Sequence, residues 1–146
     1  MKGYIIYNKT TGNINRFIYA YTKNDRLAYA NVMEGLGYVW YDGDFFNERE
    51  KNVDISDDAF PLINKTTQSL TTDTTTITAD SSSKATISSI ASGTIAFINI
   101  DGENPRTVGT PNGKIRFCTG VVGDHDIVFK NPAYLDTTVT ITATAP

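Results

Sequence analysis

The sequence predicts a mainly β protein in which a small α+β domain precedes a β-sandwich. From residue 74 onward, about six short segments rich in Ile, Val and Thr recur at intervals of roughly ten residues, with turn-forming residues between them. Most of the Tyr and Phe residues, and the single Trp, lie in the N-terminal part of the chain instead. This change in composition indicates two parts with different cores.

Composition excludes several classes of protein. With 146 residues, 40% of them hydrophobic and 20% charged, the chain can bury a core and does not resemble a disordered protein. A net charge of −3 argues against nucleic-acid binding. No segment approaches the length of a membrane span, and no apolar segment typical of a signal peptide follows Met1 and Lys2, so we expect neither membrane insertion nor export by that route.

The N-terminal part is predicted to begin with a β-hairpin. Residues 3–7 and 14–21 are rich in Ile, Tyr and Phe, and the residues between them include Asn8, Thr11 and Gly12, which favour a turn. Asn24 is a suitable helix N-cap, and the apolar spacing after it predicts a helix over 25–34 that packs on the hairpin.

A second β ribbon is expected to complete this domain. Residues 38–41 form a strongly β-prone run, a turn follows at Asp42-Gly43, and residues 45–47 are candidates for the returning strand. An extended segment at 53–55 and Pro61 end the region. We therefore assign residues 1–64 to an N-terminal α+β docking domain.

The polar, Thr-rich residues 65–73 are predicted to form a linker, and residues 74–146 to form the β-sandwich. Strands are expected over these six ranges: 74–79, 85–90, 94–100, 114–119, 125–130 and 137–144. In the last of them, apolar and Thr residues alternate strictly, which is typical of a half-buried strand. Cys118, the only cysteine, excludes an intrachain disulfide and is expected to be a small core residue.

No catalytic or metal-binding motif stands out, so the sequence predicts no enzyme, no metal and no cofactor. Asp124, His125 and Asp126 are the only acid–histidine cluster. A metal site there is disfavoured because adjacent strand residues point to opposite faces, and we interpret the three residues as a solvated turn before a strand. Asp57 and Asp58 are adjacent in sequence, which does not make them a general acid–base pair. The spacing of three other carboxylates loosely resembles a calcium loop without matching the EF-hand pattern; they are Asp42, Asp44 and Glu48.

Two stretches resemble a family of small virion proteins of tailed bacteriophages. Residues 4–14, which read YIIYNKTTGNI, are similar to the hairpin that opens many short phage tail or tail-fibre-associated proteins. Residues 76–80, 85–88 and 93–94 resemble the start of an immunoglobulin-like phage domain, and residues 123–143 resemble its end. The chain departs from that ending at Asp124–Asp126 and at Ala133.

The resemblance implies an Ig-like sandwich, a virion location and assembly with other virion proteins in multiple copies, as a homo-oligomer in the particle. It implies a tail-associated or adaptor component, with a capsid decoration protein as the alternative, and it carries no catalytic residues. A module that binds a host receptor or surface carbohydrate, a hydrolase of cell-wall polymer, and an assembly helper absent from the finished particle remain open. The aromatic residues expected at the docking interface are Tyr4, Tyr7, Phe17, Tyr19, Tyr38, Trp40, Tyr41, Phe45 and Phe46.

Overall fold

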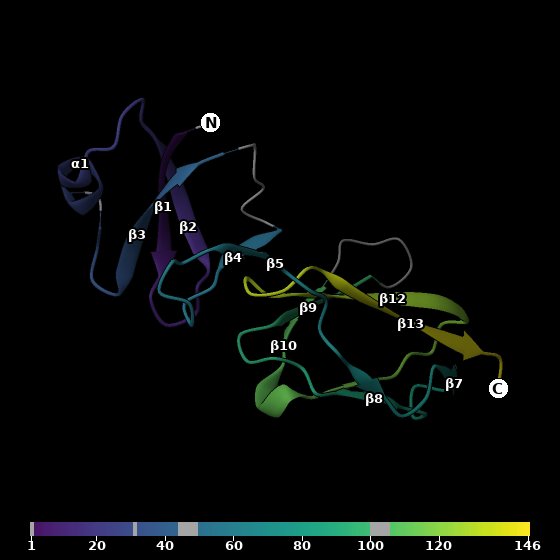
Figure 1. Ribbon diagram of the computed structural model, residues 1–146. Helices are drawn as coiled ribbons and strands as arrows, with labels where there is room; N and C mark the ends of the chain where they lie inside the picture. The colour runs from purple at the N-terminus through teal and green to yellow at the C-terminus, as the bar shows by residue number, and fades with distance from the viewer. Residues whose placement is uncertain (1, 31, 44–49, 100–105) are drawn as a thin grey trace. The chain divides into compact units, whose positions relative to one another are not determined.

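The computed structural model describes residues 2–30, 32–43, 50–99 and 106–146 and is mainly β (Figure 1). The chain divides into two compact units. Unit 1 is Met1–Lys65 and unit 2 is Thr66–Pro146.

Unit 1 is built on a three-stranded antiparallel sheet with strand order β2-β1-β3 (Figure 1). Strands β1 (Lys2–Asn8) and β2 (Ile14–Tyr19) form the predicted hairpin, which is therefore confirmed. The side chain of Asn8 shapes the turn, because its Oδ1 accepts hydrogen bonds from the main-chain N–H groups of Thr10 and Thr11 at 2.8 and 3.0 Å. Strand β3 (Leu36–Asp42) pairs with the other side of β1 along its whole length.

The central strand β1 is buried on both faces. On one face, Tyr4 and Ile6 pack with Ala28 of the helix α1 (Asp25–Ala30). On the other, Ile5 and Tyr7 pack with Val53. Val53 belongs to a small ribbon formed by β4 (Lys51–Val53) and β5 (Leu62–Asn64). Alternate side chains of one strand thus supply two separate apolar clusters.

Two expectations for this unit need correction. The helix spans six residues rather than the ten expected, so the description of unit 1 as α+β is not supported. Asn24 does cap it, accepting the Arg26 N–H at 3.2 Å. Strand β3 joins the sheet of the hairpin instead of starting a second ribbon, because its apolar residues cover both faces of β1's sheet. The expected returning strand at 45–47 lies outside the described residues.

Unit 2 contains two sheets. The strand order of the five-stranded sheet is β10-β9-β12-β13-β7, and that of the three-stranded sheet is β11-β8-β6. All pairings are antiparallel except that of β13 with β7. The strand bounds are β6 (Thr71–Thr72), β7 (Thr76–Thr78), β8 (Ala85–Ser88), β9 (Ile95–Ile98), β10 (Arg106–Gly109), β11 (Ile115–Phe117), β12 (Gly123–Lys130) and β13 (Thr137–Thr144), with a 3-10 turn η1 (Pro111–Gly113) before β11.

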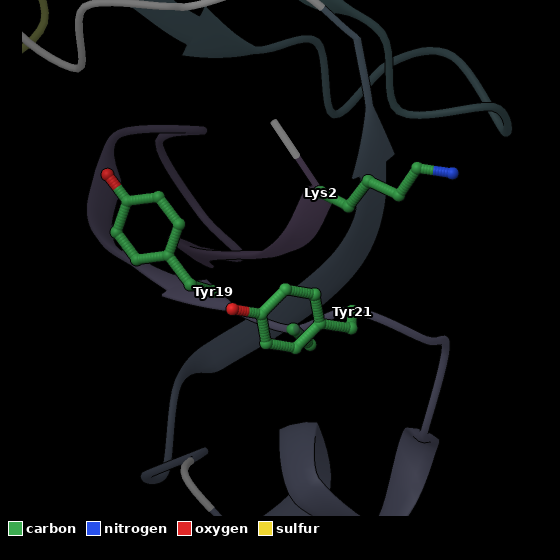
Figure 2. Close-up of a pocket in the computed structure, with 4 residues that line it drawn as sticks. Lys2, Tyr19 and Tyr21 are labelled. Atoms are coloured by element: carbon green, nitrogen blue, oxygen red, sulfur yellow. The ribbon is translucent and has the colours of Figure 1, made fainter.

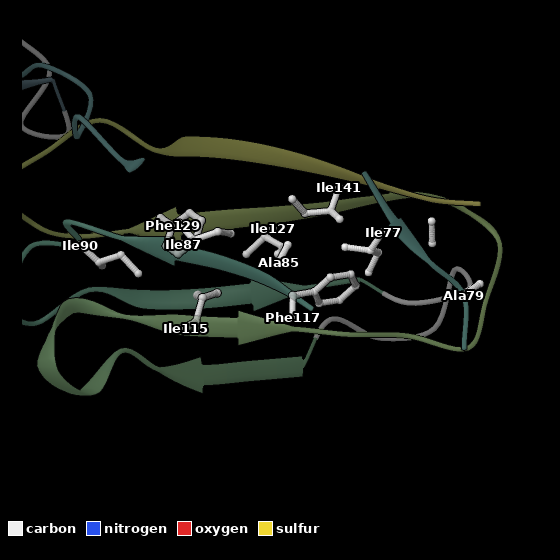
Figure 3. Packing of buried hydrophobic residues seen from close by; sticks show 12 residues of the cluster. Ile77, Ala79, Ala85, Ile87, Ile90, Ile115, Phe117, Ile127, Phe129 and Ile141 are labelled. Atoms are coloured by element: carbon white, nitrogen blue, oxygen red, sulfur yellow. The ribbon is translucent and has the colours of Figure 1, made fainter. Parts of the chain in front are cut away.

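One apolar core joins the two sheets of unit 2. Every second residue of β12 and β13 points into it, including Ile127, Phe129 and Ile141, each 0% exposed. Ile87 and Phe117 enter the same core from the smaller sheet (Figure 3). Two sheets that share one core are compatible with a β-sandwich.

The segment 65–73, expected to be a linker, belongs largely to unit 2. Strand β6 lies within it and pairs with β8. Gln68 is 6% exposed, and its side-chain amide donates to the Thr94 hydroxyl at 3.1 Å and accepts the Ala91 N–H at 2.9 Å. A polar, Thr-rich composition therefore concealed a segment held by hydrogen bonds rather than by apolar packing.

Gly12 ties the hairpin of unit 1 to strand β4. Its carbonyl accepts the Val53 N–H at 2.8 Å, and its φ is +73°. A Cβ at this position would lie 2.1 Å from the Val53 carbonyl oxygen. Gly35 has a similar φ of +79°, but a Cβ there would meet nothing within 4 Å.

We predict that Gly12→Ala destabilises unit 1 much more than Gly35→Ala. Both substitutions place a side chain in the left-handed region, at a cost of about 1–2 kcal/mol. Only Gly12→Ala also forces β4 away from the hairpin, so its loss in free energy of unfolding should exceed the other by ~2 kcal/mol or more. Chemical denaturation of the two variants measures this difference. Equal losses would show that the contact between the hairpin and β4 does not constrain the unit.

Candidate interaction surface

The structure divides the nine aromatic candidates between core and surface. Tyr4 and Tyr7 are 0% and 5% exposed, so they are core residues and their rings offer no surface to a partner. Tyr38 and Trp40 are half-buried because their rings pack edge-on against Tyr4, with centroids 5.9 and 5.0 Å apart. These four side chains therefore stabilise unit 1 first of all.

Three further candidates form a row of ring contacts that leads from the core to the surface. Tyr41 is half-buried and lies edge-on to Phe17 at 6.3 Å, and Phe17 lies edge-on to Tyr19 at 4.8 Å. Tyr19 is 69% exposed. Phe45 and Phe46 lie outside the described residues. Of the predicted interface set, Tyr19 is the member that the structure places on the surface.

Tyr19 borders a hollow of about 590 Å³ at the end of the sheet, together with Lys2, Ala20 and Tyr21 (Figure 2). Tyr21 is 100% exposed. Among the residues whose side chains the structure describes, Tyr19 and Tyr21 are the exposed aromatics. We call these four residues the tyrosine surface.

Main-chain pairing and ring packing position the tyrosine surface. The Ala20 N–H donates to the Lys2 carbonyl at 3.1 Å, which extends the hairpin ladder by one bond beyond β2. Gly3 lacks a Cβ that would come within 2.8 Å of the Phe17 ring, so Phe17 can lie close to β1 and support Tyr19. The ion pair between Lys2 and Asp42, 3.0 Å long and half-exposed at both ends, contributes little by comparison.

Sequence reasoning missed Tyr21. It was included in the second hairpin strand and treated as part of an apolar pattern. The signal that identifies it is its position between the end of β2 and the helix cap at Asn24, where the chain has no strand partner to bury a side chain.

The acid–histidine cluster of unit 2 lies within strand β12, so the prediction of a solvated turn was wrong. His125 is 3% exposed; its Nε2 lies 2.9 Å from the Val121 carbonyl and its ring packs on Phe117. Asp124 and Asp126 point to the opposite face, where they accept hydrogen bonds of 2.7 and 2.6 Å from threonines of β13. The alternation of the strand therefore separates the histidine from both carboxylates.

Cys118 also differs from its prediction, because it is exposed rather than buried. Ile115, Phe117 and Thr119 occupy the inward positions of this alternating segment, which leaves Cys118 on the outer side. In the described ranges, no group of three or more His, Cys, Asp or Glu residues is arranged to hold a metal ion. Of the three carboxylates with calcium-like spacing, Asp42 pairs with Lys2, while Asp44 and Glu48 lie outside those ranges.

Comparison of the chain with protein-family models, with curated proteins and with solved structures returns no match. Within the described ranges, neither helical segment has the length and apolar character of a membrane-spanning helix.

The buried Tyr4 hydroxyl is an acid group whose titration reports on unit 1. Burial raises the pKa of Tyr4 above its usual 10.0, and the Asp25 carboxylate, which accepts its hydrogen bond at 3.1 Å, raises it further. Burial raises the pKa of Tyr7 as well. As the pH rises past 10.0, these hydroxyls lose their protons in the unfolded chain before they do so in the folded one. Their contribution to the free energy of unfolding is therefore present below pH 10.0 and is lost as the pH rises further.

We predict that Tyr4→Phe makes this alkaline loss of stability shallower, because one of the two buried hydroxyls no longer titrates. The free energy of unfolding of unit 1, measured at a series of pH values above and below 10.0, tests this. Phe17→Leu is the control, since it changes the packing of unit 1 without removing a hydroxyl, and it should leave the slope as it is. An unchanged slope in Tyr4→Phe would contradict the burial of Tyr4.

Proposed function

We propose that this chain is a non-enzymatic structural protein of a tailed-bacteriophage particle that docks on other virion proteins in multiple copies through unit 1. A tail-associated or adaptor position is the reading that the sequence resemblance favours, and a capsid decoration protein would use the same docking chemistry. The observation that carries the proposal is the tyrosine surface, where two exposed rings border a hollow at the end of the sheet of unit 1.

Exposed tyrosines of this kind suit a protein interface. Tyrosine is enriched at interfaces because it combines a large apolar area with a polar hydroxyl and loses little conformational entropy on ordering. Phe17 already restricts Tyr19 by edge-on packing, so part of the cost of ordering is met before binding. The tyrosine surface is thus prepared for contact without a rearrangement of the core.

The size of this surface favours repeated rather than single contacts. Burying one large apolar side chain contributes about 1.5–3 kcal/mol. Two such side chains do not offset the several kcal/mol that association costs in lost translational and rotational freedom. Many copies arrayed on one particle would convert weak individual contacts into stable attachment.

The strand order of unit 2 supports an Ig-like reading of its sandwich. In chain order, β6, β8 and β11 would correspond to strands A, B and E of one Ig sheet, and β9, β12 and β13 to strands C, F and G of the other. Strand β10 extends the second sheet next to C, and β7 adds to it in parallel beside G. Such domains serve many binding roles, so this assignment supports a projecting or contact-forming part and no chemistry of its own.

A host surface glycan is the second candidate partner for the tyrosine surface. Sugar rings stack on exposed aromatic faces, and the rings of Tyr19 and Tyr21 border the same hollow. Trp40 and Tyr41, two other aromatic residues of unit 1, are half-buried and less suited to stacking. A glycan array probed with the purified chain separates the two partners, since docking on virion proteins requires no glycan signal.

The proposal predicts that the chain is present in purified particles and that Tyr19→Ser with Tyr21→Ser lowers its copy number by about tenfold or more through loss of buried apolar area. Quantitative mass spectrometry of the particles measures both quantities. Val122→Ser, which removes another exposed apolar side chain from unit 2, is the control and should be incorporated normally. Absence of the wild-type chain from particles, or normal incorporation of the double variant, would contradict the proposal.

A further inference from the structure

The inner face of the edge strand β10 of unit 2 is only partly covered by the described part of the chain. Residues directly opposite in a sheet point to the same face, so Val108, which pairs with Ala96, points toward the core side. Ala96 is 0% exposed, yet Val108 is 39% exposed. The difference arises because the sheet that carries β10 has five strands and the sheet facing it has three.

The neighbouring edge of the smaller sheet, at β11, likewise has no strand partner among the described residues. Thr86 of β8 exchanges hydrogen bonds with Asp73, so its main-chain groups face away from β11. In an antiparallel pair the groups that face the partner strand alternate, and Ile115 and Phe117 therefore make the bonds to β8. The N–H and C=O of Arg116 consequently point to the free edge.

A hollow of about 400 Å³ lies between these two edges. Val108 and Ile115 are apolar residues of its lining, and Lys114 and Arg116 are the cationic residues that border it. The described lining includes no carboxylate. The hollow thus combines an unpaired strand edge, an uncovered apolar residue and two cations.

We propose that the free edge of β11 accepts an extended segment of another protein in which apolar and acidic residues alternate. The added strand would pair with the main-chain groups of Arg116, in the manner of β-strand addition. Its inward side chains would cover Val108, and its outward side chains would lie opposite Arg116, which is exposed on the outer face. In β11 the side chains at 115 and 117 are buried and the side chain at 116 is charged and exposed. A strand that pairs with β11 is therefore expected to alternate apolar and acidic residues in the same way. The inference does not depend on the virion proposal.

Cys118 provides the reporter for a test on the full chain, since it is the only cysteine, is exposed and follows β11 directly. An environment-sensitive dye on Cys118 is titrated with a short, capped peptide in which valine alternates with glutamate. We expect saturable binding that is about tenfold weaker for the same peptide with lysine in place of glutamate. No binding of the glutamate peptide, or equal binding of the two peptides, would overturn the proposal without any change to the protein.

Two substitutions of Arg116 then separate main-chain pairing from charge. Arg116→Pro removes the N–H at the free edge, where proline is tolerated because the ladder to β8 does not use this group, and it should weaken binding about tenfold or more. Arg116→Thr keeps the N–H and should retain binding within a few-fold. Equal affinity of the proline and threonine variants would overturn strand addition. Sedimentation also tests whether the chain without peptide self-associates. If it does, and if Arg116→Pro abolishes the self-association, a second copy of the chain occupies this edge and the proposed partner is overturned.

Discussion

Burial of strand β1 on both faces is the constraint on which unit 1 depends. Tyr4 and Ile6 must be covered on one side and Ile5 and Tyr7 on the other, so a sheet of three strands needs a layer on each face. A short helix supplies one layer and the β4–β5 ribbon supplies the other. Since most of the aromatic side chains are used in these two clusters, little aromatic surface is left for a partner. The exposed rings of Tyr19 and Tyr21 lie at the end of the sheet, where no strand face has to be covered.

In unit 2 part of one sheet face is left uncovered, because the two sheets differ in their number of strands. The shared core is well covered beneath β12 and β13, where Ile127, Phe129 and Ile141 are fully buried. Toward β10 the smaller sheet ends, and the same alternation that buries Ala96 leaves Val108 accessible. Unpaired strand edges attract other strands, and natural proteins usually block them with charge. Among the described residues that line the hollow at this edge the charge is positive, which discourages a basic segment and favours an acidic one.

Unit 2 could be predicted from the sequence best where period-2 alternation is strict. The predicted strand at 137–144 coincides with β13, and its inward residues Ile141 and Ala143 were assigned to the correct face. The same alternation placed Cys118 opposite Phe117, so its exposure was already implied and the expectation of burial came from residue type alone. Alternation identifies faces more reliably than the hydrophobicity of one residue does.

Unit 1 was harder to predict, since its signals depend on tertiary partners. The run at 3–7 has no polar face, so sequence alone could not separate aromatics that form the core from those that form an interface. The apolar spacing predicted a helix over 25–34, whereas α1 ends at Ala30 and packs on the sheet through Ala28. Gln68 of unit 2 lies in a polar segment that is held in place by hydrogen bonds. No apolar pattern in the sequence predicts its burial.

The central claim is that the chain docks through the tyrosine surface and not through the buried rings. Hydroxyl-radical footprinting, read by mass spectrometry on the free chain and on intact particles, tests it directly. The account predicts that Tyr19 and Tyr21 are oxidised in the free chain and protected in the particle, while Tyr4 and Tyr7 are protected in both. Equal oxidation of Tyr19 and Tyr21 in the two states would contradict it.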